Sequence, residues 1–275
     1  MTSTSADKDK NFCHTFWDAC EAGNSSQVQE ALASDQLTPK IRNEGFVAAV
    51  LAGINPGVVD VISALLAAGE PITPRVRDAV HGENFEQSPA VLRLLFDNGL
   101  DPNASQSRDF EPADSLVQTG GEPLLNFIND PACAREFLSR GADPNITGPR
   151  GETALYKALE DQHVDMAEML IEYGTKLEPN FLFTTIHLRW RGPDTGIRER
   201  MTKFLLDHGV DPNQATSETW GTPLHLAAFY DNADIVKMLL DAGADRKKKV
   251  NSWRFSCVTA EQLLLKKDDK RVSWA

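Results

Sequence analysis

Residues 99–103 read Gly-Leu-Asp-Pro-Asn, and residues 141–145 (Gly-Ala-Asp-Pro-Asn) and 209–213 (Gly-Val-Asp-Pro-Asn) repeat the pattern. Each copy follows a stretch with apolar residues at helical spacing, such as VLRLLFDNG before the first. Three further glycines end similar stretches: Gly69, Gly174 and Gly243. Successive glycines in this set are 30, 42, 33, 35 and 34 residues apart. A near-constant period in the low thirties is typical of a stacked repeat, so it predicts a solenoid.

The composition is that of a folded, acidic protein. The chain has 275 residues, 41% hydrophobic and 25% charged, with a formal net charge of −12. Such a surface repels phosphate backbones and anionic lipids, so we expect neither nucleic acid nor a membrane as the main partner. The polar start, MTSTSADKDKN, lacks the apolar core of a signal peptide. We therefore expect a cytoplasmic or nuclear protein that is not secreted, with residues 1–10 as a disordered tail.

The four cysteines show neither disulfide nor metal spacing. Cys13, Cys20, Cys133 and Cys257 are scattered through the chain. Cys13-His14 together with Cys20 lacks a fourth ligand and a Cys-x-x-Cys pair, so small buried apolar residues are the better interpretation. We expect no metal and no cofactor.

The clearest repeat begins with Thr222-Pro223-Leu-His-Leu-Ala-Ala. Threonine suits a helix N-cap, and proline suits the first helical turn, where its missing N–H is not needed. The following leucine and two alanines form an i, i+3, i+4 apolar face. A second helix is predicted over 233–241, and Gly243 suits the left-handed position that ends such a helix.

This arrangement of helix, tight turn, helix and glycine resembles the ankyrin repeat. TPLHLAA at 222–228 matches the family signature TPLHxA, and residues 151–156 (GETALY) keep part of it with tyrosine in place of histidine. The resemblance covers about residues 12–267. It implies an all-α solenoid of stacked helix-turn-helix units with short β-turn or hairpin fingers. Degenerate, loop-rich repeats of this style are similar to those of ankyrin proteins from filamentous fungi.

We expect a single solenoid over 11–268, followed by a tail at 269–275. It consists of an N-terminal capping repeat, six full repeats and a C-terminal capping helix. Their predicted bounds are 12–34, 38–70, 72–103, 120–145, 147–177, 180–213, 219–249 and 259–267.

Three insertions interrupt the period. The largest, 104–119, lies where ankyrin proteins place a projecting β-finger and carries Phe110 among polar neighbours. It is interpreted as a solvated loop or as a binding loop that folds over a groove. A second insertion, 82–89, lengthens a turn on the side away from the fingers, where we expect little function.

The third insertion, 190–196, adjoins a cationic and aromatic cluster. Its members are His187, Arg189, Trp190 and Arg191. Arginine and tryptophan are enriched at binding hot spots, so these residues are candidate binding residues. Alternatively, Trp190 only seals the lengthened loop.

The resemblance implies that the residues after the Ala-Ala pair end each inner helix and face a concave groove. In the last full repeat these residues are Phe229 and Tyr230, and Trp220 lies just before them in a finger. Exposed neighbouring aromatics are costly without a partner. They bind a ligand or they contact the next repeat or the finger at 251–257; both alternatives stay open. An apolar ligand with a basic group suits this end of the groove, whereas a carboxylate would meet Arg189 or Arg191.

His225 occupies the structural position of the family signature, where the ring bonds backbone of the adjacent finger. It is therefore not expected to be a catalytic base. His14, His81, His163 and His208 are isolated in sequence.

No phosphate loop, HExxH or GxSxG motif is present. The leading hypothesis is a non-catalytic module that binds a protein or peptide on its concave face, including the case of an inhibitory subunit. The alternative is a small-molecule binder or groove enzyme, for example an accessory cyclase or isomerase of a fungal biosynthetic pathway. Its pocket would lie between the 104–119 loop, Trp190 and Tyr230. Its candidate acid and base residues are Glu160, Asp161 and His187.

Overall fold

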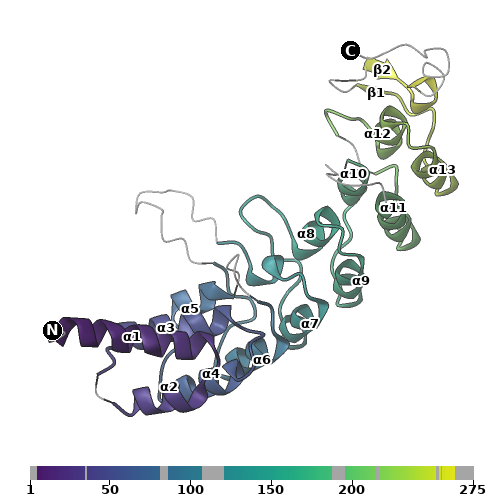
Figure 1. Ribbon diagram of the computed structural model, residues 1–275. Helices are drawn as coiled ribbons and strands as arrows, with labels where there is room; N and C mark the ends of the chain where they lie inside the picture. Colours follow the sequence, from purple (N-terminus) through teal and green to yellow (C-terminus); the bar gives the residue numbers. More distant parts are fainter. Residues whose placement is uncertain are drawn as a thin grey trace, which may run out of the picture. The chain divides into compact units, whose positions relative to one another are not determined.

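The computed structural model of the chain describes residues 5–34, 36–80, 86–106, 121–187, 196–214, 217–251, 254 and 256–263. Side chains are described from residue 12 on, except at 251, 256 and 257. Pairs of antiparallel helices joined by tight turns dominate the described residues (Figure 1). The chain divides into two compact halves, 1–154 and 155–275.

The N-terminal half contains two rows of helices. In chain order they are α1 (Ser5–Glu21), α2 (Ser25–Leu32), α3 (Pro39–Leu51), α4 (Val58–Ala67), α5 (Pro74–Ala79), α6 (Pro89–Asp97), the 3-10 helix η1 (Leu124–Phe127) and α7 (Pro131–Ser139). Helices α1, α3 and α5 pack against one another in sequence to form one row. Helices α2, α4, α6 and α7 do the same in the other row.

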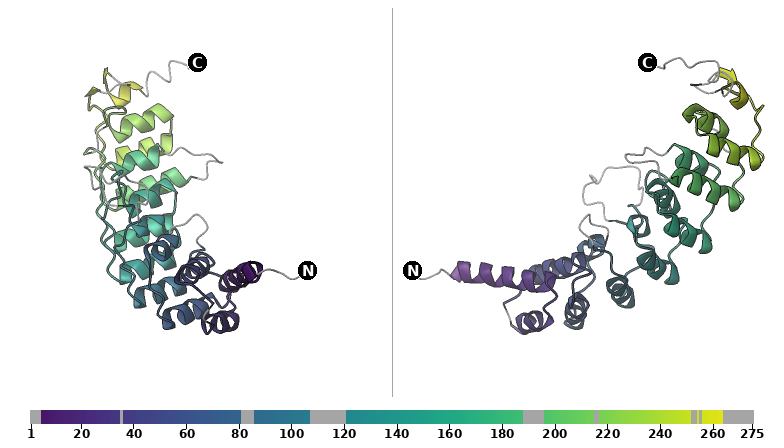
Figure 2. Two further views of the ribbon diagram at one scale, coloured as in Figure 1. Left: turned by 90° about the vertical axis from the view of Figure 1, so that its left-hand side faces the viewer. Right: turned by 45° about the vertical axis from the view of Figure 1, so that its right-hand side comes forward.

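The C-terminal half repeats this arrangement. Its elements are α8 (Ala154–Glu160), which begins at the boundary, α9 (Val164–Glu172), α10 (Phe181–Ile186), α11 (Ile197–Asp207), α12 (Pro223–Tyr230), α13 (Ala233–Asp241) and the strands β1 (Val250–Asn251) and β2 (Ser256–Val258). Helices α8, α10 and α12 lie on one side, and α9, α11 and α13 on the other (Figure 2). The strands pair as an antiparallel hairpin with Val250 opposite Val258.

A threonine followed by proline begins several inner helices. The hydroxyls of Thr38, Thr73 and Thr222 each accept a hydrogen bond from the backbone N–H three residues later. These bonds satisfy N–H groups that have no partner inside the helix. The N-cap predicted at Thr222 is thereby confirmed. The predicted inner face is buried as well: Leu224 is 2% exposed, and Ala227 and Ala228 are fully buried.

The Gly-x-Asp-Pro-Asn motif ends one repeat and links it to the next. Gly99, Gly141 and Gly209 have φ values of 97°, 89° and 84°, in the left-handed region where glycine carries no Cβ penalty. In each copy the aspartate side chain accepts a hydrogen bond from the N–H two residues later, which fixes the turn.

In two copies of this motif, the asparagine bonds backbone in the following repeat. Asn213 Nδ2 donates to the carbonyl of Gly243 at 2.8 Å, and its Oδ1 accepts from the N–H of Asp245 at 2.8 Å. Asn103 makes the same pair of bonds to Gly141 and Asp143. Asn103 and Asn213 therefore each connect two successive turns by a pair of hydrogen bonds. The repeat period alone does not predict these bonds.

Two predicted elements differ in the structure. Helix α1 begins at Ser5, so the tail expected over 1–10 is wrong for residues 5–10. The segment has no glycine or proline, the residues that most disfavour a helix. The inner element of the repeat at 120–145 is the 3-10 helix η1 instead of an α-helix.

The helices of the six full repeats lie within their predicted bounds, whereas the division into repeats and a single continuous solenoid stay predictions. Helical conformation begins at residue 260, inside the predicted capping helix 259–267. The base of the 104–119 insertion is an antiparallel bridge between Ser105 and Pro123, as a finger requires. Residues 107–120, with Phe110, lie outside the described residues.

Candidate functional site

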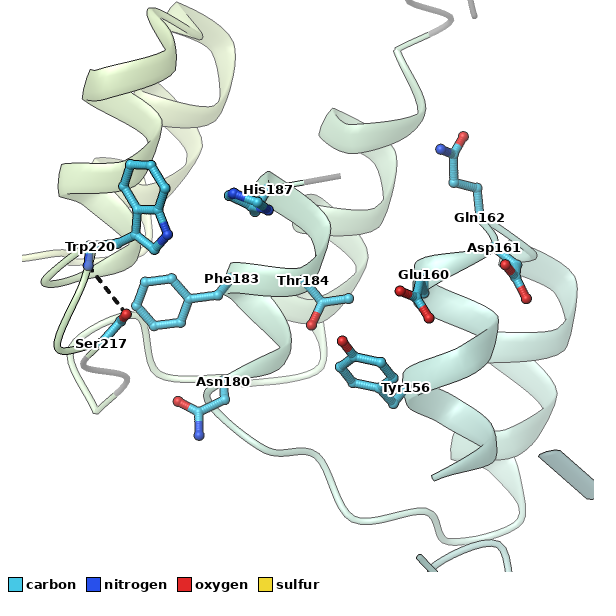
Figure 3. Close-up of a pocket in the computed structure, with 10 residues that line it drawn as sticks. All are labelled: Tyr156, Glu160, Asp161, Gln162, Asn180, Phe183, Thr184, His187, Ser217 and Trp220. Atoms are coloured by element: carbon cyan, nitrogen blue, oxygen red, sulfur yellow. Dashed lines mark hydrogen bonds between the residues drawn. The ribbon is translucent and has the colours of Figure 1, made fainter. Parts of the chain in front are cut away.

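An open groove of about 750 Å³ runs along the inner helices of the C-terminal half (Figure 3). Helix α8 and the turn after it form one end, α10 forms the floor, and the finger before α12 forms the other end. We call this site the inner groove. Its lining residues are Tyr156, Glu160, Asp161, Gln162, Asn180, Phe183, Thr184, His187, Ser217 and Trp220.

Four rings gather at the α12 end of the inner groove and form what we call the aromatic wall. The ring centroids of Trp220 lie 5.4 Å from His187, 5.2 Å from Phe229 and 5.9 Å from Tyr230. His187 lies 5.8 Å from Tyr230, and Phe229 lies 5.4 Å from Tyr230. These tilted and edge-on arrangements are the ones that aromatic quadrupoles favour. The structure therefore brings together four of the predicted site residues.

Arg254 covers part of this wall from the hairpin finger. Its guanidinium carbon lies 4.4 Å from the Trp220 ring centroid and 5.5 Å from that of Phe229, within the range of a cation–π interaction. Of the two open alternatives for these aromatics, contact with the finger at 251–257 is thus present. It leaves Phe229 37% and Tyr230 40% exposed, so it does not exclude a ligand.

A tight turn holds Trp220 at the groove. Ser217 and Gly221 pair through two backbone hydrogen bonds, of 2.7 and 2.8 Å. The Ser217 hydroxyl accepts from the N–H of Trp220 at 3.2 Å. Gly221 has φ +74°, and a Cβ there would lie 2.6 Å from the side chain of Val250. The finger geometry therefore requires glycine directly after the tryptophan.

Glu160 and Asp161 form the acidic end of the groove. Both side chains belong to exposed residues at the end of α8. The chain turns sharply after them, since Gln162 has φ +65°. Lys157 Nζ lies 3.9 Å from Glu160 Oε2, a partly exposed i, i+3 pair of small energetic weight. Figure 3 shows both carboxylates at the opposite end of the groove from Trp220.

Sequence reasoning missed the floor of the groove. The floor is lined from α10 and its two capping positions by Asn180, Phe183, Thr184 and His187. Their positions correspond to i, i+3, i+4 and i+7, one face of a helix. That spacing was a signal in the sequence, but only His187 was singled out. Tyr156 was missed because it stands at the position of the family histidine.

Four predicted site residues lie outside the described residues: Phe110, Arg189, Trp190 and Arg191. The pocket predicted between the 104–119 loop, Trp190 and Tyr230 is untested for the same reason.

His225 has the structural role expected of it. It is fully buried, and its Nε2 donates to the carbonyl of Val258 at 3.1 Å. The carbonyl only accepts, so Nδ1 is left to accept from the Thr222 hydroxyl at 2.7 Å. Burial lowers the pKa of His225, and Lys248 adds to this, whereas the Val258 carbonyl opposes it. The ring is therefore neutral and joins α12 to the hairpin.

In the N-terminal half, Asn129 and Asp130 follow the inner element η1, much as Phe229 and Tyr230 end α12. They form hydrogen bonds within the protein. Gln87 Oε1 accepts from the N–H groups of Asn129 and Asp130 at 3.0 and 2.8 Å. Gln87 Nε2 donates to the carbonyl of Phe127 at 3.2 Å. The Asp130 carboxylate caps α7 by accepting from the N–H of Cys133 at 2.8 Å. Gln87 belongs to the second insertion, which thus has a packing role.

The described cysteines behave as apolar core or near-core residues. Cys20 and Cys133 are buried, and Cys13 is half-buried. Burial raises the pKa of the Cys20 thiol to about 12 and also raises that of Cys133. Among the described residues, no three His, Cys, Asp or Glu side chains gather closely enough to hold a metal ion. Within the same residues, no helix has the length and apolarity to cross a membrane.

These features define a helix-pair repeat protein with an aromatic and acidic groove. Comparisons with known proteins identify the repeat. The family described as "Ankyrin repeats (3 copies)" matches residues 195–250, and "Ankyrin repeats (many copies)" matches residues 129–171. The chain contains ankyrin repeats at these residues, as its signature predicts. The expected likeness to proteins of filamentous fungi stays a prediction.

The chain is similar to several proteins of known name. It is 26% identical over 202 residues to the E3 ubiquitin-protein ligase KEG of Arabidopsis thaliana, covering 58% of this chain and 12% of that protein. It is 25% identical over 229 residues to human Ankyrin repeat and SOCS box protein 6, covering 73% and 52%. A third relative is Putative ankyrin repeat protein YahD of Escherichia coli, 26% identical over 206 residues, with 70% and 95% covered.

Among solved structures, the ankyrin repeat domain of Bcl-3 aligns with a TM-score of 0.56 at 20% identity. The alignment covers 84% of this chain and 95% of that domain. At this identity the likeness shows the fold alone, here the ankyrin-repeat fold.

Proposed function

We propose that the chain is a non-catalytic binding module that holds an extended segment of a partner protein in the inner groove. The aromatic wall carries the proposal. Phe229 and Tyr230 stay 37% and 40% exposed at a helix end although two further rings and Arg254 contact the cluster. Aromatic side chains are enriched at the centre of protein interfaces and supply much of the binding energy.

The fold supports this proposal in general terms. Ankyrin-repeat domains bind protein partners, and solenoid repeats offer extended surfaces for this purpose. The net charge of −12 disfavours nucleic acid and anionic membranes. A cytoplasmic location fits the proposal but stays a prediction.

The relatives do not define the activity more closely. This chain spans 12% of the plant protein named as a ubiquitin ligase and 52% of the human protein named for its SOCS box. Functions of whole relatives are therefore not transferred to it. The protein-binding role proposed here rests on the repeat and on the exposed aromatic wall.

The enzyme alternative gains no support from the groove. Its candidate acids, Glu160 and Asp161, lie exposed at one end, and His187 belongs to the aromatic wall at the other (Figure 3). Acid–base catalysis needs groups that converge on one reacting atom, usually in a site that excludes water. An open groove with its candidate groups at opposite ends is suited to binding along its length.

The proposal is tested by selecting peptides from a displayed random dodecapeptide library on the purified full chain. We expect the selected peptides to bind wild type and to lose at least tenfold in affinity for Phe229→Ala/Tyr230→Ala. Truncating an interface aromatic costs more than about 1 kcal/mol, which corresponds to several-fold for each residue.

Tyr173→Ala is the matched control. Tyr173 follows α9, belongs neither to the groove lining nor to the aromatic wall, and is 41% exposed, close to the 40% of Tyr230. Peptides that bind wild type, Phe229→Ala/Tyr230→Ala and Tyr173→Ala equally well would contradict the choice of this surface. Circular dichroism and unfolding curves confirm that each variant is folded.

A further inference from the structure

We infer that the inner groove selects an extended peptide that carries a lysine or arginine at one end and a planar apolar side chain about five or six residues away. The inference rests on the proposed function and names the chemistry of the partner. The cation lies at the acidic end, Glu160 and Asp161, and the planar side chain lies against Trp220 and His187.

The charges of the groove favour a cation at the α8 end. Glu160 and Asp161 are exposed and line the groove together. Among the described residues that line it, none is lysine or arginine. Lys157 Nζ lies 3.9 Å from Glu160 Oε2, a weak pair that leaves the acidic end open to a partner's cation. Complementary charge across an interface fixes register and excludes partners of the wrong sign.

The other end favours an apolar group because its cation position is filled. The Arg254 guanidinium lies 4.4 Å from the Trp220 ring centroid and 5.5 Å from that of Phe229. A second cation at this ring would meet the charge of Arg254. The groove side is lined by Phe183, Thr184 and His187 together with Trp220. A planar apolar side chain packs there without like-charge repulsion.

The two ends set the spacing of the peptide anchors. The acidic end lies on α8 and Trp220 lies directly before α12, with α10 between them (Figure 3). Packed helices have axes about 8–10 Å apart, so the two anchors are separated by roughly 16–20 Å. An extended chain rises about 3.3 Å per residue. Side chains about five or six positions apart therefore span the groove.

The test uses labelled synthetic peptides of serine and threonine that contain one lysine and one phenylalanine. The two anchors are placed two, six or ten positions apart, and binding to the full chain is followed by fluorescence anisotropy. We expect the peptide with six positions to bind at least tenfold more tightly than the other two. Replacing its lysine with glutamate should also weaken binding at least tenfold. Preference for the glutamate peptide would overturn the inference.

Protein variants locate the cation. Glu160→Gln/Asp161→Asn should lose at least fivefold for the lysine peptide and less than twofold for a matched glutamine peptide. Glu168→Gln/Glu172→Gln is the control, because it removes the same charge from exposed positions of α9 outside the groove. Equal losses in both double variants would show only a long-range charge effect and would overturn the assigned site.

The outcomes separate this inference from the proposed function. Selected library peptides that need Phe229 and Tyr230 but carry no cation at this spacing would overturn the inference and leave the binding module intact. Failure of all three designed peptides would overturn it as well. Library peptides that ignore Phe229 and Tyr230 would remove the proposed function itself.

Discussion

The repeat that contains α12 and the repeat that contains η1 both pair an inner element with an outer helix, but they differ in length and in the residues that hold them. From Thr222 to Asn232, the caps of α12 and α13, the chain advances ten residues. From Glu122, at the position of Thr222, to Asp130, the cap of α7, it advances eight. With two residues fewer, the inner element is the 3-10 helix, whose rise per residue is larger than that of an α-helix.

The two repeats also bond the following finger differently. His225 donates to the carbonyl of Val258, 33 residues later. Asn126 Nδ2 donates to the carbonyl of Glu152, 26 residues later, at 3.1 Å. In the shorter repeat, Gln87 accepts hydrogen bonds from the backbone N–H groups that follow η1. At the corresponding position the longer repeat exposes Phe229. Exposed groups for a partner are therefore found where the repeat stays close to the family pattern.

The largest effect is expected from His225→Ala. It removes two hydrogen bonds of a fully buried ring and leaves a hydroxyl, a carbonyl and a cavity behind. Together these changes should lower the free energy of unfolding by about 2–4 kcal/mol. Amide hydrogen exchange should show reduced protection in α12 and β2, with α3 and α4 unchanged, because repeat stability is largely a sum of local terms. Uniform loss of protection over all helices would contradict this account.

The stability of the α12 repeat should also depend on pH. Burial lowers the pKa of His225, so the unfolded chain binds a proton on this residue at a pH where the folded chain does not. Its contribution is present above about pH 6.5 and is lost as the pH falls through that value toward the folded pKa. The difference in unfolding free energy between wild type and His225→Gln should shrink from pH 7.5 to pH 5.5, as measured by urea unfolding.

The other five of the six histidines are present in both proteins, so any contribution they make cancels in this difference. A gap between wild type and His225→Gln that is constant or larger at pH 5.5 would show that the ring is not held neutral.

The fold was predictable wherever a residue acts through its own local geometry. Thr222 caps its helix and Gly99 ends one because cap chemistry and positive φ depend on residue type. The bridge from Asn103 to Gly141 was not predictable, because the period gives the spacing of turns but not the atoms that meet between them. The 3-10 helix was missed because Pro123-Leu124 matches the Pro-Leu of the TPLHxA signature and so favours a full α-helix.

An intermediate effect is expected from Asn126→Ala in the shorter repeat. The side chain is 6% exposed and bonds both Glu122 Oε1 and the carbonyl of Glu152. Its loss should cost about 1–2 kcal/mol, less than His225→Ala because no ring-sized cavity forms. Hydrogen exchange should report the change in η1 and α7. A cost equal to that of His225→Ala would remove the difference between the two repeats.

The candidate site was predicted in its aromatic part and missed in its floor. The resemblance to the ankyrin repeat predicts that the aromatic residues at the end of α12 and in its finger face a groove. The structure brings their rings into contact, together with His187. Phe183 and Thr184 follow from the helical spacing within α10, which was not used. That Arg254 covers Trp220 depends on the path of the hairpin finger, which has no signal in the repeat period.

The smallest effect is expected from Arg254→Ala. An exposed cation–π contact contributes about 0.5–1 kcal/mol, so unfolding in urea should shift only slightly. Arg254→Lys keeps the charge but loses the planar stacking of the guanidinium, and should fall between wild type and alanine. A shift beyond 2 kcal/mol would assign Arg254 a role in the core that its exposure does not suggest.

The most direct test of the central claim follows the tryptophan indole N–H signals by NMR during titration with a selected peptide. Trp220→Phe assigns the groove signal. Trp17, half-buried in α1 with its Nε1 donating to the carbonyl of Ile41 at 3.3 Å, is the internal control. We predict that the Trp220 signal moves in proportion to bound peptide and that the Trp17 signal does not. Binding that leaves the Trp220 signal unchanged would contradict the assignment of the inner groove as the binding site.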